Sequence, residues 1–366
     1  MQNYKIKYDI TIQIAVGMLI YCQQNEGRLD LMIKQRYDLW EDGEYTYPMS
    51  FGFQPNLVSY LHEDTDEPRP CVIVVPGGGY RIVSPTEGEI VAKKFYEKGY
   101  QAFVCIYTVN ITGTAPLKDQ PVKDLARAVR YVRKNAEKFG IDPERTVVCG
   151  FSAGGHLCGS LCVHYEEIGE KNPEYADCSA RPDAGILCYP VISSGNCGHS
   201  DSFKMLLGDD ADPMDLEYAS LEKQVTENTP PCFLWQTATD ELVPVENSYL
   251  MAQALKEKGI PFAHHIFSQG RHGLSLANQE WADENYGELY TLEQVMNMVE
   301  MVKCGEIPCA EEDKKQLFAA FGGVDEETEI PRPKCEPNRE VEIWPDLADW
   351  WLKERFTKKE MKQNKQ

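Results

Sequence analysis

The sequence predicts an α/β protein with a mainly parallel β-sheet and helices on both of its faces. Short apolar runs rich in Val, Ile, Phe and Cys lack polar alternation, which is typical of strands buried on both faces. Amphipathic segments separate these runs, which is the order expected of repeated strand–helix units. The length of 366 residues fits one large domain with insertions.

The predicted elements alternate along most of the chain. The predicted strands are Asn56–Leu61, Cys71–Val75, Gln101–Tyr107, Thr146–Cys149, Ala184–Tyr189, Cys232–Gln236 and Phe262–Phe267. The predicted helices are Glu87–Lys98, a segment that opens at Pro121, His156–His164, Val245–Lys258 and Pro345–Phe356. Proline suits the first turn of a helix because the N–H that it lacks would be unpaired there.

Two regions interrupt this alternation. Residues 1–53 contain no clear strand–helix unit, and we interpret them as an N-terminal cap segment preceding a domain at 54–366. Within that cap, Ile10–Cys22 is too short and too polar for a membrane span, so it predicts a buried strand or helix rather than a signal peptide. The domain carries an insertion at about 287–343 with a predicted helix at Leu292–Val302. Three alternatives are open for this insertion: it shapes the site, it forms a subunit contact, or it is a surface loop with neither role.

Charge and cysteine usage exclude some classes of protein. The net charge of −21 argues against nucleic acid or an anionic membrane as a partner, since both need a basic surface. The thirteen cysteines are an odd number scattered through predicted strands and helices, which favours a reducing compartment, and we predict a cytoplasmic protein. Cys304 and Cys309 lack the partners that a zinc site needs, so no metal is predicted.

The segment Gly150-Phe151-Ser152-Ala153-Gly154 matches the pattern G-x-S-x-G. It follows a predicted strand and precedes a predicted helix, which is the context of a nucleophile elbow. Such a turn is so tight that the residues two positions from the serine must be small. The pattern therefore predicts Ser152 as a nucleophile at the carboxyl end of a strand, with the N–H of Ala153 facing a developing oxyanion.

A serine hydroxyl needs a base, and the base needs an orienting acid. Among seven histidines, His272 is the predicted base, because it follows the last strand in a glycine-flanked loop. His156 lies one helical turn after Ser152 and is predicted to anchor that helix. Asp240 follows the strand Cys232–Gln236 and is the predicted acid, with Glu241 as the alternative. The remaining histidines carry no predicted role: His62, His164, His199, His264 and His265.

The run Pro76-Gly77-Gly78-Gly79-Tyr80 follows another buried strand. Glycines there let the backbone approach a substrate closely and point N–H groups at it. By itself the run also suits a flexible turn or a phosphate-binding loop, but it lacks the Lys-Ser/Thr ending of a P-loop. Beside the elbow, it predicts an oxyanion-binding loop.

These passages together resemble the α/β-hydrolase esterases, in particular the acetyl esterase branch with feruloyl and acetylxylan esterase-like proteins. The resemblance rests on "VVPGGGY", "VVCGFSAGGHL", "TDELVPVENS" and "FSQGRHGLSLA", with "WPDLADWWLKERF" as the closing helix. It implies Ser152, Asp240 and His272 as the catalytic triad and backbone N–H groups of Gly78, Gly79 and Ala153 as the oxyanion hole. Pro76 departs from the histidine of many relatives.

The resulting hypothesis is hydrolysis of carboxylic esters through an acyl-enzyme, without a metal or organic cofactor. The resemblance suggests a short acyl group, such as acetyl on a small molecule or oligosaccharide. Two alternatives stay open: a peptidase on the same fold, and a non-catalytic binding or scaffold protein. Assembly into a homo-oligomer is left open as well.

Overall fold

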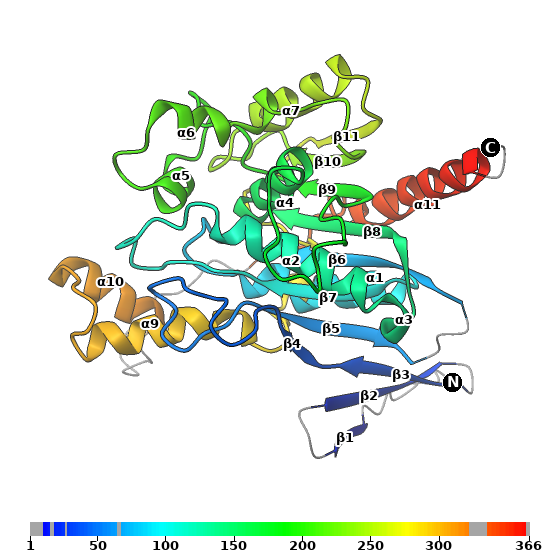
Figure 1. The fold of residues 1–366 in the computed structure, drawn as a ribbon, viewed down its shortest axis with the longest axis horizontal. Helices are drawn as coiled ribbons and strands as arrows, with labels where there is room; N and C mark the ends of the chain where they lie inside the picture. The colour runs from blue at the N-terminus through cyan, green and yellow to red at the C-terminus, as the bar shows by residue number, and fades with distance from the viewer. Residues whose placement is uncertain (1–9, 15–17, 26–27, 64–66, 322–334, 364–366) are drawn as a thin grey trace.

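The computed structural model describes residues 10–14, 18–25, 28–63, 67–321 and 335–363. Over these residues the chain forms an 11-stranded sheet in the order β1-β2-β3-β5-β7-β6-β8-β9-β10-β11, with β4 paired to β5 (Figure 1). The strands are β1 (Ile10–Ile14), β2 (Met18–Asn25), β3 (Arg28–Lys34), β4 (Arg36–Asp38), β5 (Asn56–His62), β6 (Arg69–Val75), β7 (Gln101–Ile106), β8 (Ile141–Phe151), β9 (Ala184–Cys188), β10 (Cys232–Thr237) and β11 (Phe262–Phe267).

The strands from β7 to β11 pair in parallel, and β5 joins β7 in the antiparallel sense. All seven predicted strands are confirmed to within one or two residues at each end, apart from β8, which begins five residues earlier than predicted. The burial of β6, β7, β9 and β10 agrees with the lack of polar alternation in their sequences.

The N-terminal segment, predicted as a cap, forms strands where the structure describes it. β1, β2 and β3 form an antiparallel meander, and β3 pairs with the end of β5 through Met32 and Ile33. β4 pairs with the beginning of the same strand. The described parts of residues 1–53 therefore contribute strands that lengthen the sheet. β1, β2 and β3 pair in sequence without intervening helices, and β3 and β4 also pair with β5, so no strand–helix pattern indicated them.

Helices cover both faces of the sheet (Figure 1). One face carries α1 (Glu89–Glu97) and α11 (Trp344–Gln363), which meet through the rings of Phe95 and Trp344. The other carries α2 (Gln120–Lys134), α4 (Ala153–His164) and α7 (Glu246–Glu257). The shorter helices are α3 (Ala136–Phe139), α5 (Ser200–Leu207), α6 (Pro213–Tyr218), α8 (Gln279–Ala282) and the 3-10 turns η1 (Pro85–Glu87), η2 (Leu221–Lys223) and η3 (Tyr290–Leu292).

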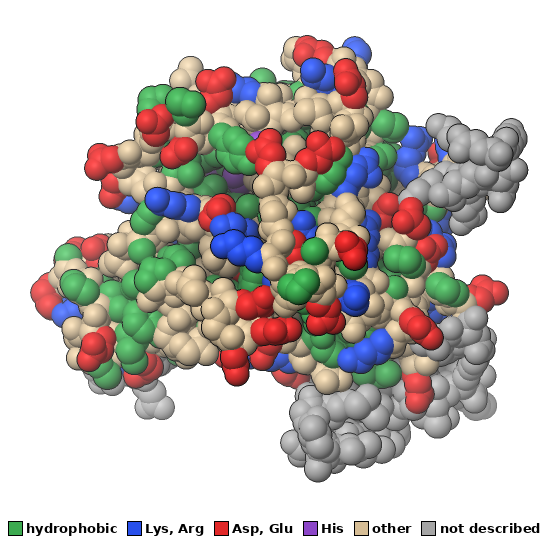
Figure 2. All heavy atoms as spheres, viewed as in Figure 1, with side chains coloured by type: hydrophobic (Ala, Val, Ile, Leu, Met, Phe, Trp, Pro, Cys, Tyr) green, Lys and Arg blue, Asp and Glu red, His purple; other side chains and the backbone are tan. Residues whose placement is uncertain are grey.

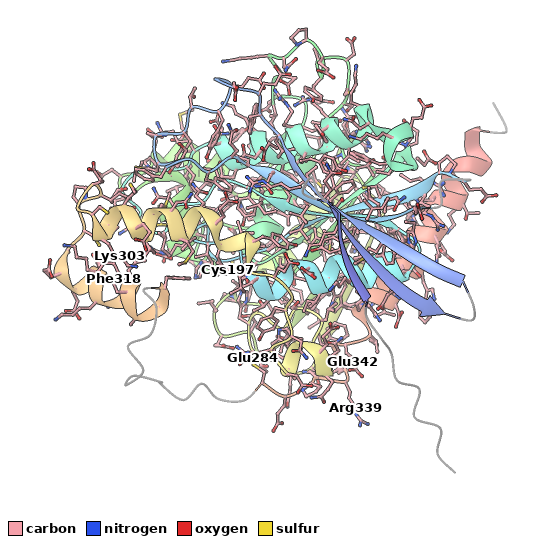
Figure 3. The ribbon with its side chains drawn as sticks, turned by 90° about the horizontal axis from the view of Figure 1, so that it is seen from below. Cys197, Glu284, Lys303, Phe318, Arg339 and Glu342 are labelled. Carbon is pink, nitrogen blue, oxygen red and sulfur yellow. The ribbon has the colours of Figure 1, made fainter. Side chains whose placement is uncertain are left out.

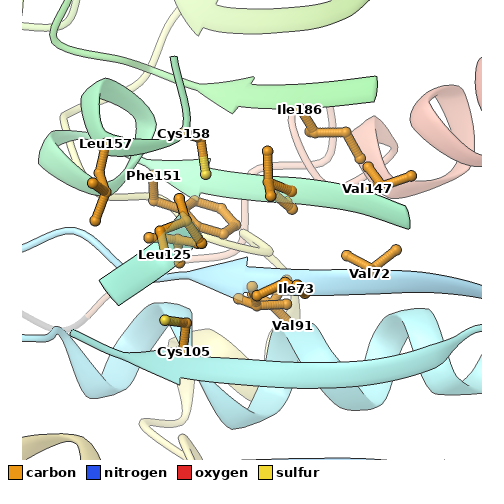
Figure 4. Packing of buried hydrophobic residues seen from close by; sticks show 14 of the residues in the cluster. Val72, Ile73, Val91, Cys105, Leu125, Val147, Phe151, Leu157, Cys158 and Ile186 are labelled. Carbon is orange, nitrogen blue, oxygen red and sulfur yellow. The ribbon is translucent and has the colours of Figure 1, made fainter. Parts of the chain in front are cut away.

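The core fills the space between the sheet and these helices. In Figure 4, Val72 and Ile73 of β6 lie beside Val147 of β8, and Leu125 and Leu157 approach from helices α2 and α4. All five side chains are buried. Burying a side chain of this size contributes about 1.5–3 kcal/mol. Several cysteines, such as Cys105 and Cys158 in the same view, serve as small apolar core residues.

The inserted segment forms two helices, α9 (Glu293–Lys303) and α10 (Glu311–Phe321). α9 confirms the helix predicted at Leu292–Val302. Both helices project beyond the end of the sheet, where Figure 3 labels Lys303 and Phe318. The buried side chains of α9 include Val295, Met298 and Val299, and the Gln294 Oε1 accepts a hydrogen bond of 2.9 Å from the N–H of Val109. This part of the insertion is thus packed onto the domain.

The described residues include no helix with the length and apolar character that a membrane span requires. On the face seen in Figure 2, Asp and Glu side chains lie among Lys and Arg side chains instead of gathering in one acidic patch. Acidic and basic side chains are therefore interspersed on this face (Figure 2).

Candidate active site

Ser152 lies in the turn between β8 and α4, as the elbow pattern predicts. Its backbone has φ 53° and ψ −118°, a conformation that is strained for a residue with a side chain. A Cβ on Gly150 would lie 2.2 Å from the Gly154 carbonyl oxygen, and one on Gly154 would lie 2.2 Å from the Val75 carbonyl oxygen. Both positions therefore require glycine, because backbone atoms occupy the space that a side chain would take.

The structure brings Ser152, His272 and Asp240 into contact. The Oγ of Ser152 lies 2.8 Å from Nε2 of His272, and Nδ1 of His272 lies 2.7 Å from Oδ2 of Asp240. A carboxylate only accepts hydrogen bonds, so Nδ1 carries the proton and Nε2 is free to accept one from the serine. The other oxygen of Asp240 accepts the backbone N–H groups of Leu242 and Val243, at 3.0 and 2.9 Å. Asp240 is thus the acid that contacts His272, whereas Glu241 is exposed.

The loop that carries His272 is braced by residues 338–344, at the end of the insertion and the start of α11. Asn338 donates its side-chain N–H to the Gln269 carbonyl at 2.9 Å, and Glu340 accepts the N–H of Ser268 at 3.0 Å. The indole N–H of Trp344 donates to the Ser275 carbonyl at 2.8 Å. Figure 3 labels Arg339 and Glu342 in this bracing segment. No local pattern predicts these contacts, because they join residues about 70 positions apart.

The glycine loop after β6 lies against the elbow. A Cβ on Gly77 would be 2.6 Å from the Phe151 carbonyl oxygen and 2.9 Å from the Ser152 Cβ. Gly78 and Gly79 have φ values of 119° and 64°, which favour glycine. Within the described residues, the N–H groups of Gly78, Gly79 and Ala153 have no hydrogen-bond partner in the protein. Three donors therefore remain available beside the serine.

Pro76, where many relatives have histidine, is held through its main-chain carbonyl. The hydroxyl of Tyr107 donates to the Pro76 carbonyl at 2.7 Å, so the start of the glycine loop is held by a neighbouring strand. Proline also fixes its own φ angle. This hydrogen bond supports the loop from its main chain, without a side chain at position 76.

Glu87 is buried beside the glycine loop. The sequence predicts it only as the first residue of a helix. One of its oxygens accepts the N–H of Gly77 at 2.7 Å, and the other accepts the hydroxyl of Tyr189, also at 2.7 Å. The Tyr189 ring packs edge-on against the His272 ring at 5.0 Å, and its oxygen accepts the N–H of Ser275 at 3.0 Å. Burial raises the pKa of Glu87, and these hydrogen bonds partly oppose the shift. Glu87 thus joins the glycine loop to the side chain that packs against His272.

His156 anchors the elbow helix, as predicted. Its Nε2 donates to the Ala219 carbonyl at 2.8 Å, and its Nδ1 accepts the hydroxyl of Tyr80, also at 2.8 Å. Burial lowers the pKa of His156 to about 4, so the ring is neutral at pH 7. Behind it, between α2, α4, α5 and α6, lies a hollow of about 460 Å³ whose lining does not include Ser152. His264 and His265 belong to β11, as predicted.

No group of three or more His, Cys, Asp or Glu side chains is arranged to hold a metal ion among the described residues. The polar groups at the site are one hydroxyl, one imidazole, one carboxylate and main-chain N–H groups. This set suits nucleophilic attack on a carbonyl carbon, followed by stabilisation of an oxyanion.

Residues 57–255 match the model of the BD-FAE family, which covers the elbow, the glycine loop and the acid. The chain belongs to the BD-FAE family. Two curated relatives illustrate the similarity. Endo-1,4-beta-xylanase B of Butyrivibrio fibrisolvens is 53% identical over 71% of this chain and 41% of its own length. Acetylxylan esterase of Xylanibacter ruminicola is 30% identical over 63% of this chain and 46% of its own length. The BD-FAE chain thus spans less than half the length of these two relatives.

Solved structures give the same fold. The acetyl ester-xyloside bifunctional hydrolase of Caldicellulosiruptor lactoaceticus is 40% identical, with a TM-score of 0.62 over 75% of this chain and 97% of that one. MGS-M1, an alpha/beta hydrolase from a deep-sea metagenome library, has a TM-score of 0.56 at 24% identity over 88% of this chain and 98% of that one. The BD-FAE chain therefore has the α/β-hydrolase fold, as its strand order and elbow also indicate.

Proposed function

We propose that this chain is a serine esterase that cleaves short-acyl esters, with Ser152 as nucleophile, His272 as base and Asp240 as orienting acid. One observation carries the proposal: His272 bridges the Ser152 hydroxyl at 2.8 Å and the Asp240 carboxylate at 2.7 Å. The two contacts fix the ring in the tautomer that accepts a proton from serine.

In the proposed reaction, Nε2 of His272 takes the hydroxyl proton while Ser152 Oγ forms a bond to the ester carbonyl carbon. The carbonyl oxygen becomes an oxyanion, and the N–H groups of Gly78, Gly79 and Ala153 donate to it. Collapse of this intermediate breaks the carbon–oxygen bond to the alcohol, which leaves with the proton from His272. Water then loses a proton to His272, attacks the acyl-enzyme and releases the acid and free Ser152.

The proposed substrate is an acetyl ester of a carbohydrate. Two relatives support this class by their names: an acetylxylan esterase and an acetyl ester-xyloside bifunctional hydrolase. The first named relative is a xylanase, and this chain matches only 41% of its length, so cleavage of the xylan backbone is not proposed.

We also propose that residues 54–366 form the catalytic domain and that the protein works in a reducing compartment such as the cytoplasm. The second part is supported by the free thiols of twelve cysteines in the described chain, of which Cys71, Cys105 and Cys149 are buried in strands.

A fluorophosphonate probe tests the mechanism directly. The folded protein should be labelled at Ser152, and the Ser152→Ala and His272→Ala variants should not be labelled. Release of acetate from acetylated xylo-oligosaccharides then tests the substrate class. Folded protein that resists the probe would favour a non-catalytic binding role, and labelled protein that cleaves peptides but not esters would favour a peptidase.

A further inference from the structure

Three polar side chains lie beside the candidate active site without a part in the proposed reaction. Arg81 follows Gly79 by two positions, and its Nε and Nη2 donate to the two oxygens of Asp201, each at 2.7 Å. Asp201 lies in the first turn of α5, and His199 precedes that helix. The Arg81 and Asp201 side chains are 34% and 41% exposed, so this cluster reaches solvent.

The cluster borders the space in front of the glycine loop. Apart from its chain neighbours, a Cβ on Gly79 would meet one atom of the described residues within 4 Å, which is Oδ2 of Asp201 at 4.0 Å. Gly79 is one of the proposed oxyanion donors, so the Asp201 carboxylate lies next to a residue that would bind the reacting ester group.

His199 lies on the same side of the site. Its Nδ1 is 2.8 Å from the Ser202 hydroxyl, which leaves Nε2 without a protein partner in the described chain. Burial lowers the pKa of His199, Asp201 raises it and the charge of His272 lowers it further. The ring is thus within electrostatic range of both Asp201 and His272.

The inserted segment supports this cluster from behind. Nη1 of Arg81 donates to the Ile111 carbonyl at 3.2 Å. Ile111 packs against the buried cluster of Met298, Val302 and Ile307, as do Leu317 and Phe318 of α10. The hydrogen bonds with Asp201, and to a smaller extent the charge of Asp313 on α10, raise the pKa of Arg81. The insertion therefore reaches the rim of the site through these contacts.

The chemistry of the cluster selects a class of alcohol. A carboxylate paired with an arginine keeps lone pairs that accept hydroxyl protons, and a free imidazole nitrogen and guanidinium edges add further hydrogen-bonding positions. An apolar alcohol would remove water from these groups without replacing its hydrogen bonds, which is unfavourable. The hydroxyl groups of a sugar can replace the hydrogen bonds that the displaced water made.

We propose that Arg81, Asp201 and His199 form the subsite that binds hydroxyl groups on the alcohol half of the ester, which is a sugar ring. This subsite deepens the proposed esterase function and rests on it. The acetyl group then lies over the glycine loop and Ser152, and the sugar extends toward α5.

The test compares two acetyl esters in the full chain. 4-Nitrophenyl acetate has no hydroxyl groups, whereas acetylated xylotriose has several. In His199→Phe and Asp201→Asn, kcat/KM for acetylated xylotriose should fall about 10- to 100-fold, the loss expected when hydrogen bonds to charged or buried groups are removed. For 4-nitrophenyl acetate it should change by less than about threefold, because uniform loss would mean damage to the shared machinery.

Asp209→Asn is the matched control, since Asp209 is a surface carboxylate that pairs with Lys204 at 2.7 Å near the other end of α5. It should leave both activities unchanged. His199→Phe leaves the Arg81–Asp201 pair intact, so it decides the question if Asp201→Asn fails to fold.

Equal losses on both substrates would overturn the subsite and assign the cluster to holding the glycine loop. Unchanged activity on both would overturn it as well. Wild-type protein that cleaves 4-nitrophenyl acetate but not acetylated xylotriose would overturn the subsite alone, and wild-type protein that cleaves neither would overturn the proposed function.

Discussion

The contact between the glycine loop and the nucleophile gives a prediction whose size follows from the structure. In Gly77→Ala the new Cβ would lie 2.6 Å from the Phe151 carbonyl oxygen, 2.9 Å from the Ser152 Cβ and 3.1 Å from an oxygen of Glu87. Ordinary contacts begin near 3.4 Å. The loop and the elbow must therefore separate by about 0.8 Å to restore a van der Waals contact.

This displacement moves the proposed oxyanion donors relative to Ser152. A misplacement of about 1 Å can cost about 100-fold in rate, and loss of one oxyanion donor costs about 100- to 1,000-fold. We expect kcat for 4-nitrophenyl acetate to fall about 100-fold, while KM changes little. The strain should also lower the free energy of unfolding by about 1–3 kcal/mol.

The assay measures kcat per fluorophosphonate-labelled site, so that unfolded protein is not counted. Gly169→Ala is the matched control, because a Cβ at Gly169 meets nothing within 4 Å and that residue is exposed. A folded Gly77→Ala protein with kcat within about twofold of wild type would refute the reasoning, since the close contacts would then be unrelated to catalysis.

The acid, the buried glutamate and the elbow histidine give three further predictions. Asp240→Asn should lower kcat by about four orders of magnitude, as for other triad acids, whereas exposed Glu241→Gln should stay within about twofold. Glu87→Gln places an amide N–H₂ against the Gly77 N–H or the Tyr189 hydroxyl, so kcat should fall at least about 10-fold with KM unchanged, in initial-rate kinetics. Burial lowers the pKa of His156 from 6.5 to about 4, so the unfolded chain takes up this proton first as pH falls. His156 should therefore cost the fold about 3 kcal/mol between pH 6.5 and 4, measured by urea unfolding, and His156→Gln should remove that part of the pH dependence.

Each of these outcomes has a clear opposite. If Glu241→Gln is the severe change, the acid is misassigned. If Glu87→Gln raises KM and leaves kcat unchanged, Glu87 acts on substrate binding rather than on positioning. If the stability of wild type and of His156→Gln falls in parallel with pH, other groups cause the acid sensitivity.

Local sequence determined the parts of this protein that depend on local sterics and periodicity. The elbow could be predicted because Gly150 and Gly154 leave no space for a side chain, a requirement that any sequence with this turn must meet. The buried strands could be predicted because parallel strands covered on both faces have no polar alternation. The contact of Ser152 with His272 and Asp240 could be predicted because each residue lies in the loop after a predicted strand, and the carboxyl ends of parallel strands share one edge of the sheet.

The tertiary structure alone decided which distant segments support those residues. Glu87 reads as an ordinary helix-start acid, yet burial places it between Gly77 and Tyr189, which is 102 positions away. Of the N-terminal strands, β3 and β4 pair with β5, which no local pattern predicts. Arg81 and Asp201 are 120 positions apart, and no local pattern pairs them. Periodicity and turn sterics act over a few residues, whereas the pairing of buried polar groups depends on how the whole chain packs. Local sequence patterns therefore predicted the reacting groups. Only the tertiary structure showed which distant residues hold those groups in place.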